Sequence, residues 1–165
     1  MSWRALLEPD LTLGTTVLSL TPDLLAQHGL KGLILDVDET LLPTSKSQLS
    51  VELVQWATQL KLEANIWLVS NNLNEVRIQQ IANSLGLPYL AGAGKPSRRK
   101  IRQALAAMAL PPQQVGMVGD RLFTDVLAGN RLGLFTILVE PITDDGQTWK
   151  HWLRSLEIWL AQHLM

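Results

Sequence analysis

The chain has no cysteine, only three histidines and no long apolar run. The absence of cysteine from all 165 residues excludes disulfides, zinc thiolate sites and thiol catalysis. His28, His151 and His163 share no metal-ligand spacing, so we expect no histidine metal site. Nowhere do eighteen consecutive apolar residues occur, which argues against a membrane-spanning helix. A metal bound by this chain must therefore be held mainly by oxygen atoms.

Charge of either sign is also scarce. Charged residues make up 18% of the chain, the formal net charge is −1, and no block of five like charges occurs. This balance argues against nucleic-acid binding through a broad basic field. The first thirty residues lack a basic start and a small-residue cleavage site. We therefore expect a cytoplasmic protein that is either soluble or peripherally bound to the inner face of a membrane.

Short apolar runs alternate with helical patterns, which is typical of βαβ units and a parallel sheet. The length suits one domain covering residues 1–165. We expect a three-layer α/β/α fold whose central parallel sheet has about five strands. The expected strands are 32–37, 66–69, 89–91, 115–118 and 135–139; the expected helices follow Ser50, follow Asn72 or Asn74 until Gly86, run from Pro96 to 110, and span 124–131.

Polar residues follow three of these strands. Asp36 and Asp38 follow the first strand in the stretch "LILDVDETLLP", Ser70 and Asn71 follow the second, and Asp120 follows the fourth. Ligands of such sheets bind beyond the carboxyl ends of the strands, where the strand order reverses. We therefore expect these side chains to open onto one edge of the sheet.

Carboxylates that meet beside apolar strands need a partner. At about 4 Å, Asp36 and Asp120 would repel each other by roughly 4 kcal/mol at an effective dielectric constant of 20. A divalent cation removes this cost, and Mg²⁺ suits a site of carboxylates and substrate phosphate. Phosphoryl transfer through an aspartyl-phosphate uses such a site. The simpler alternative, in which the acids only form a turn or cap a helix, remains open for each motif taken alone.

Four motifs occur in order: "DVDET" (36–40), "SNN" (70–72), "GKP" (94–96) and "GDRLFTD" (119–125). This set resembles the motifs of haloacid-dehalogenase (HAD) superfamily phosphatases. The resemblance implies a HAD-like Rossmannoid fold and a Mg²⁺-dependent phosphomonoesterase. An acid two residues after the nucleophile favours a phosphatase over a dehalogenase, because an ester oxygen must be protonated.

By the same resemblance, Asp36 is the nucleophile and Asp38 the general acid and then base. Thr40 supports their loop, Ser70 binds a phosphate oxygen and Lys95 stabilises the phosphoryl charge. The implied metal ligands are Asp36, the backbone carbonyl of Asp38, and Asp120, with Asp125 nearby.

Four further residues have two readings each. Asn71 either contributes to substrate binding or caps the next helix, and Arg121 either binds a headgroup or is a surface residue. Arg98 and Arg99, in "SRRK", either bind substrate or form a solvated helix face.

The intervals 39–69 and 71–94 are too short for a cap domain, so we expect a site open to large substrates. The blocks "LTPDLL", "GLKGLILDVDETLLP", "LVSNN" and "GDRLFTDVLAGNRLGLFTILVEPI" resemble YqeG-type subfamily IIIA phosphatases, which are related to phosphatidylglycerophosphate phosphatases. This likeness implies hydrolysis of phosphatidylglycerophosphate to phosphatidylglycerol at a membrane surface, with an anionic phospholipid as partner.

Other readings stay open. The chain could instead hydrolyse a phosphoprotein, a nucleotide or another soluble phosphate ester. A non-catalytic receiver domain is disfavoured, because its phosphorylated aspartate follows the third strand rather than the first. We also expect an amphipathic, tryptophan-rich helix over about 147–163, which either docks on the domain or contacts a membrane.

Overall fold

The computed structural model describes residues 2–143, 157–160 and 162–163. Its elements in chain order are α1 (Trp3–Leu6), β1 (Leu11–Thr12), the 3₁₀ turn η1 (Val17–Ser19), α2 (Pro22–Gln27), β2 (Gly32–Leu35), α3 (Val51–Lys61), β3 (Asn65–Val69), α4 (Glu75–Leu85), β4 (Tyr89–Leu90), α5 (Arg99–Met108), the 3₁₀ turn η2 (Pro112–Gln114), β5 (Val115–Gly119), the π-helical turn η3 (Leu122–Val126), α6 (Leu127–Arg131) and β6 (Phe135–Leu138).

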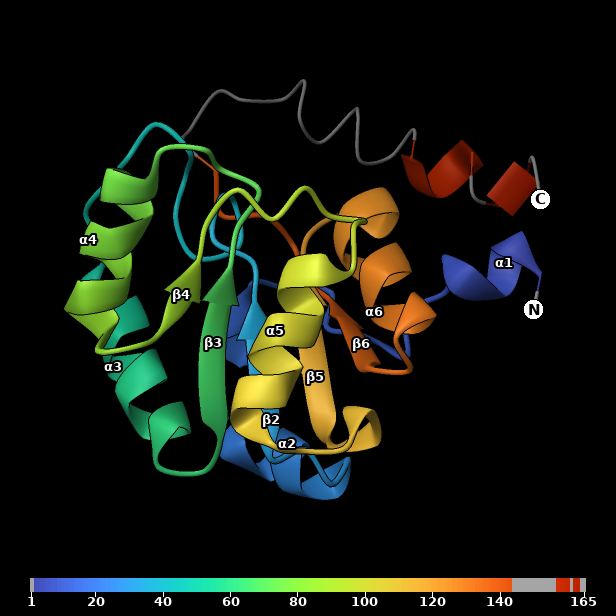
Figure 1. Cartoon of the computed structure of the whole chain (residues 1–165), viewed down its shortest axis with the longest axis horizontal. Coiled ribbons are helices and arrows are strands. Elements are labelled where there is room, and N and C mark those ends of the chain that lie inside the picture. Colours follow the sequence, from blue (N-terminus) through green and yellow to red (C-terminus); the bar gives the residue numbers. More distant parts are fainter. Residues whose placement is uncertain (1, 144–156, 161, 164–165) are drawn as a thin grey trace.

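The strands form one parallel sheet in the order β1-β6-β5-β2-β3-β4 (Figure 1). From β2 the chain builds outward through β3 to β4, and it then returns to the other side of β2 with β5 and β6. The strand order therefore reverses between the neighbours β2 and β5. In open α/β sheets this reversal leaves a crevice beyond the carboxyl ends of the two strands, where ligands bind.

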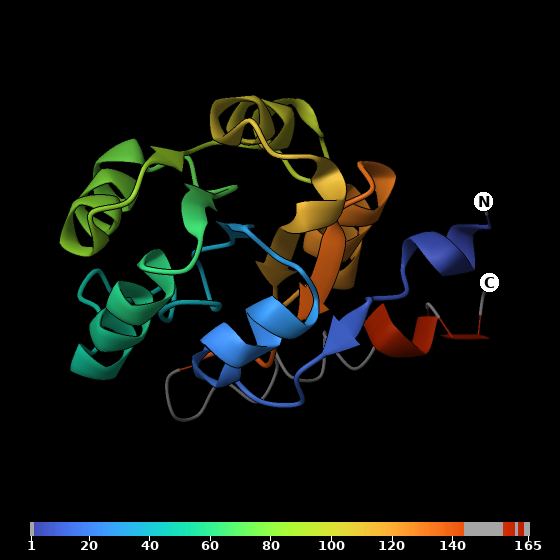
Figure 2. The same ribbon diagram turned by 90° about the horizontal axis from the view of Figure 1, so that it is seen from below.

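Helices cover both faces of the sheet and make three layers (Figure 2). Alternate side chains of β2 point to opposite faces, so that Leu33 and Leu35 join one core and Ile34 joins another. The first core is shared with α2, α3 and α4, and the second with α5 and α6. Both faces of β2 are buried, which explains its uninterrupted apolar sequence.

Local signals fix the helix ends near the reversal point. The Ser50 hydroxyl accepts a hydrogen bond from the Leu53 N–H and starts α3. Asn74, rather than Asn72, caps α4 by accepting from the Arg77 N–H. Gly86 ends α4 in the left-handed conformation, with φ of 63°.

The α/β prediction is confirmed, with four differences in detail. The sheet has six strands instead of about five, because the two-residue edge strand β1 pairs with β6. Strand β2 ends at Leu35 and not at Val37, since the chain turns there to present its acids. The helix expected over 124–131 begins as the wider turn η3, and the one expected from Pro96 begins at Arg99.

The tryptophan-rich helix expected over 147–163 lies largely outside the described residues. The part that is described, 157–160 and 162–163, is helical, and Ile158 packs against Leu7, Leu122 and Leu138. In the described part of the chain no helix has the length and apolar character needed to cross a bilayer.

One hydrogen bond ties the first core to the N-terminal segment: the Trp56 indole N–H donates to the Leu20 carbonyl at 2.8 Å. We expect Trp56→Phe to lower the free energy of unfolding by about 1–3 kcal/mol, because the buried carbonyl loses its partner. Trp3→Phe, the same change at an exposed position, should stay within about 0.5 kcal/mol of the parent. Urea denaturation measures both, and equal losses would contradict the role given to this bond.

Candidate active site

The strand ends bring together side chains from four distant segments. Asp36 follows β2 and Asp120 follows β5, the two strands that flank the reversal of strand order. The register pairs Leu35 with Val118, and the Asp36 N–H donates to the Val118 carbonyl at 2.9 Å. The acidic pair thus lies in the crevice that the topology creates.

Lys95 links two of the acids. Its Nζ lies 2.8 Å from Asp36 Oδ1 and 2.7 Å from Asp125 Oδ1, and its side chain is 1% exposed. Burial by itself lowers the pKa of Lys95, but the charges of Asp125 and Asp36 outweigh burial and raise this pKa above its ordinary value. Lys95 is therefore a permanent positive charge under the crevice.

The carboxylates outnumber this lysine. Oxygens of Asp36, Asp120 and Asp125 lie within 4.8 Å of one another, and all three residues are buried. Burial, followed by the charges of Asp36 and Asp125, raises the pKa of Asp120 to about 8. Burial and the charge of Asp36 also raise the pKa of Asp125 to about 6, although Lys95 opposes this effect. One ammonium group cannot balance three carboxylates, so the cluster has an excess of negative charge. This excess affects Asp120 most, because Lys95 pairs with the other two acids.

Thr40 joins the two acids of the crevice. Its hydroxyl lies 3.3 Å from Asp36 Oδ2 and 3.4 Å from Asp120 Oδ1, so it can donate to either. The turn that carries Thr40 back toward β2 passes through Glu39, whose φ of 66° is in the left-handed region. This turn is what ends β2 two residues earlier than its apolar sequence suggests.

Asp38 points to a different set of partners. Its Oδ1 accepts from Arg77 Nη1 at 2.6 Å, and its Oδ2 accepts from Asn72 Nδ2 at 2.9 Å. Arg77 also donates to the carbonyls of Lys46 and Pro43. One buried guanidinium thus ties the Asp38 carboxylate to the loop that follows it.

Ser70 and Asn71 complete the edge. The buried Ser70 hydroxyl oxygen accepts from the Asn72 N–H at 3.0 Å, which leaves its own proton free to be donated. Asn71 does not cap α4. Its Oδ1 accepts from the Lys95 N–H at 2.6 Å, and its Nδ2 donates to the Lys95 carbonyl at 3.1 Å. Asn71 therefore holds the backbone of Lys95 at a fixed place.

A glycine makes room for the fourth segment. A Cβ at Gly119 would collide with the Asp125 carboxylate. Because η3 folds back on the end of β5, Asp125 lies against the Gly119 backbone and also accepts from the Arg121 N–H at 3.4 Å. The glycine of "GD" is thus required for Asp125 to reach Lys95.

Most of the candidate residues line one pocket of about 260 Å³. Asp36, Asp38, Ser70, Asn71, Lys95 and Arg121 face it, together with Glu39, Thr44 and Thr124. Thr40, Asp120 and Asp125 are not part of this lining, but they lie close to Asp36, which is. Arg98 and Arg99 line a different hollow, on α5.

The sequence analysis missed Arg77 and Asn72. Arg77 is only 8% exposed and lies on the same helix stripe as Ile81, one turn further along α4. A cation on the apolar stripe of a helix is a signal that could have identified it. For Asn72 the sequence offers no comparable signal, because its partner Asp38 is set by the tertiary fold.

The donor set fits a hard divalent cation. The cluster offers carboxylate oxygens, and burial together with the neighbouring charges of Asp36 and Asp125 raises the pKa of Asp120, so a cation there would stabilise its ionised form. Both oxygens of Asp125 already have partners, Lys95 and the Arg121 N–H, whereas Asp36 pairs with Lys95 through Oδ1 and keeps Oδ2 beside the Thr40 hydroxyl that also contacts Asp120. Asp36 and Asp120 are therefore the side chains best placed to hold a metal.

Comparison with known proteins agrees with this chemistry. A family model described as HAD-hydrolase-like matches residues 92–157. The Bacillus subtilis (strain 168) protein named "Probable phosphatase YqeG" is 36% identical over 132 residues, which cover 79% of this chain and 76% of that protein. Phosphatidylglycerophosphate phosphatase 1, chloroplastic, of Chlamydomonas reinhardtii is 34% identical over 148 residues, covering 81% of this chain and 54% of that protein.

Solved structures share the fold. A protein described as a putative subfamily III A hydrolase of the HAD superfamily, from Legionella pneumophila, superposes with a TM-score of 0.55 at 16% sequence identity. The superposition covers 85% of this chain and 90% of that one. The chain belongs to the HAD-like hydrolases, within the YqeG-type group of phosphatases.

Proposed function

We propose that the chain hydrolyses phosphatidylglycerophosphate through an aspartyl-phosphate formed on Asp36. The observation that carries the reaction is the meeting of Asp36, Asp38 and Lys95 in the crevice between β2 and β5. Support for the lipid substrate comes from the relationship to the Chlamydomonas phosphatidylglycerophosphate phosphatase. A terminal phosphate on a lipid can reach the site, because the described segments between the first three motifs hold only α3, β3, α4 and β4, with no inserted cap.

The geometry supports a two-step reaction. An Asp36 oxygen attacks phosphorus, and the leaving oxygen takes a proton from the Asp38 carboxyl. Asp38 then accepts a proton from a water molecule, which attacks the phosphoryl group and releases inorganic phosphate and free Asp36. The Ser70 hydroxyl and the Lys95 ammonium bind phosphoryl oxygens. Asn71 acts through Lys95 by positioning its backbone.

The HAD superfamily uses a divalent metal, and we propose Mg²⁺ here. Asp36, Asp120 and the backbone carbonyl of Asp38 would hold it, with Asp125 behind them. Bound there, the cation neutralises the carboxylates and the phosphoryl charge. Arg121 lines the pocket, where it can contact the headgroup. The enzyme would act from the cytoplasmic face of the membrane that contains its lipid.

The nucleophile assignment predicts that Asp36→Asn lowers turnover by at least about 10³-fold, because the attacking charge is lost. Phosphate release from phosphatidylglycerophosphate in mixed micelles with Mg²⁺ measures this. Acid quenching of a labelled reaction should leave phosphate on the parent protein but not on Asp36→Asn. Asp23→Asn, a change at an exposed acid in α2, is the matched control.

The same assay tests the substrate. If the parent protein does not hydrolyse the lipid but turns over a nucleotide or phosphopeptide well, the substrate proposal is wrong and the phosphatase assignment stands.

The metal proposal predicts a particular dependence of stability on pH. Without metal, the raised pKa keeps Asp120 protonated in the folded protein at pH values where the unfolded chain has lost that proton. The folded state then binds more protons, so stability falls as pH rises from about 4 to about 8, by up to about 1.4 kcal/mol per pH unit for one proton. Asp120→Asn should remove much of this slope, and Asp23→Asn should not.

Thermal melts in EDTA across this pH range, repeated with Mg²⁺, measure both effects. Mg²⁺ should raise the melting temperature of the parent protein more at the alkaline end, because binding requires an ionised Asp120. Asp120→Asn should lose most of this shift. An equal Mg²⁺ shift in both proteins would contradict the ligand assignment.

Arg77 is expected to position the proton donor. We expect Arg77→Gln to lower kcat/KM for glycerol 3-phosphate by about 10- to 100-fold, because the Asp38 carboxyl is no longer aimed at the leaving oxygen. For 4-nitrophenyl phosphate, whose leaving group needs no proton, the loss should be small. Arg77→Lys keeps the charge and should recover part of the activity, and Asp38→Asn gives the same substrate pattern as a reference. Equal losses on both substrates would reduce Arg77 to a purely structural residue.

A further inference from the structure

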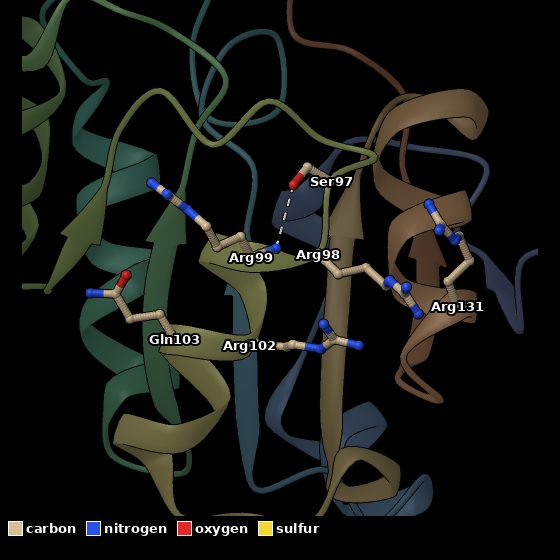
Figure 3. Close-up of a pocket in the computed structure, with 6 residues that line it drawn as sticks. All are labelled: Ser97, Arg98, Arg99, Arg102, Gln103 and Arg131. Atoms are coloured by element: carbon tan, nitrogen blue, oxygen red, sulfur yellow. Dashed lines mark hydrogen bonds between the residues drawn. The ribbon is translucent and has the colours of Figure 1, made fainter.

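A basic surface lies next to the candidate active site. It is a hollow of about 690 Å³ on α5 and α6, lined by Ser97, Arg98, Arg99, Arg102, Gln103 and Arg131 (Figure 3). In Figure 3, Arg98 and Arg102 extend from α5 toward Arg131 at the end of α6, and Arg99 extends to the other side of the helix. We call this surface, defined by its four arginines, the arginine face.

In the described part of the chain, no carboxylate pairs with the arginine face. Among the described residues, none of its four arginines forms an ion pair with an acid, and Arg131 reaches only the Pro96 carbonyl, at 3.5 Å. The charges of Arg131 and Arg102 lower the pKa of Arg98, so these cations repel one another. Such crowding is relieved when anions bind between the guanidinium groups.

The charge pattern of the sequence is equally one-sided here. Residues 76–119 hold six of the fourteen cations of the chain and none of its fifteen acids. The remaining residues are therefore strongly acidic, although the whole chain has a net charge of only −1. A local positive surface on an otherwise negative protein fits a partner that meets one face of the molecule.

The location of the arginine face relates it to the active site. Ser97 comes two residues after Lys95, and Arg98 directly precedes the first residue of α5, at the carboxyl edge of the sheet. The same edge carries Leu73, directly after the "SNN" loop, with 88% of its surface exposed. Arginines and an exposed leucine at the same edge of a protein are typical of a surface that meets the headgroup region of a bilayer.

We propose that the arginine face docks the enzyme on an anionic phospholipid membrane, with the catalytic edge of the sheet toward the lipid. The hollow is larger than the 260 Å³ catalytic pocket and spans two helices, so it can meet several headgroup phosphates at once. Clusters of four or more cations near a membrane bind anionic lipids in this way. The proposal rests on the proposed function for its biological meaning, because it names the surface on which that substrate would be met.

The experiment measures sedimentation with vesicles that contain no substrate. Vesicles of phosphatidylcholine with phosphatidylglycerol are compared with vesicles of phosphatidylcholine alone. The test variant is Arg102→Gln/Arg131→Gln, and Arg4→Gln/Lys31→Gln removes the same charge from exposed positions outside the arginine face. Thermal melts establish that all three proteins are equally folded.

The parent and the control should bind the anionic vesicles, bind the neutral ones weakly, and lose binding as salt is raised. The test variant should lose about 25-fold in its partition coefficient, from roughly a fivefold contribution per arginine. Its hydrolysis of 4-nitrophenyl phosphate should equal that of the parent. Hydrolysis of phosphatidylglycerophosphate on anionic vesicles should fall with binding, but hydrolysis in detergent micelles should not.

Three results would overturn the proposal: no binding of the parent to anionic vesicles, equal binding to neutral vesicles, or equal loss in both variants. Loss of binding to a single-stranded oligonucleotide, with vesicle binding intact, would assign the arginine face to nucleic acid instead. The two proposals fail separately. Vesicle binding without hydrolysis of the lipid phosphate refutes only the substrate, and hydrolysis in micelles with unaltered vesicle binding of the test variant refutes only the docking surface.

Discussion

The structure depends on the burial of three carboxylates around one ammonium group at the point where the strand order reverses. Asp36, Asp120 and Asp125 come from the ends of β2 and β5 and from η3, and Lys95 pairs with only two of them. Buried charge is costly unless it is paired. The surrounding features follow from this cost: a raised pKa at Asp120, a shared hydroxyl from Thr40, and an excess of negative charge that suits a divalent cation and the HAD-type chemistry of the family.

Much of this arrangement could be predicted from the sequence, because it depends on topology more than on packing detail. Apolar runs gave the central strands, and acids directly after them had to meet at one edge once the sheet was parallel. Asp36, Ser70 and Lys95 lie in one pocket for this reason. The short edge strand β1 escaped prediction, since two residues carry no periodicity and their pairing with β6 is a tertiary contact.

The partners of Asp38 could not be predicted from the sequence for a similar reason. Its contact with Arg77 joins a loop to a helix that is 39 residues away, and no local pattern encodes that distance. The role of Asn71 was left open between a cap and a substrate contact. The structure excludes the cap, because Asn74 caps α4; Asn71 faces the pocket, and its side chain also holds the backbone of Lys95.

This hold on Lys95 has a mechanical consequence. Two hydrogen bonds of the Asn71 side-chain amide connect the loop after β3 to the turn that carries Lys95. The Ser70 hydroxyl and the Lys95 ammonium group are therefore held at a fixed distance from each other. Asp38 is bound to the same loop through Asn72, so a wider pocket for a different ester must come from the side formed by the segment after β5, which carries Arg121 and Thr124. Differences in substrate choice between relatives of this chain should accordingly trace to that side.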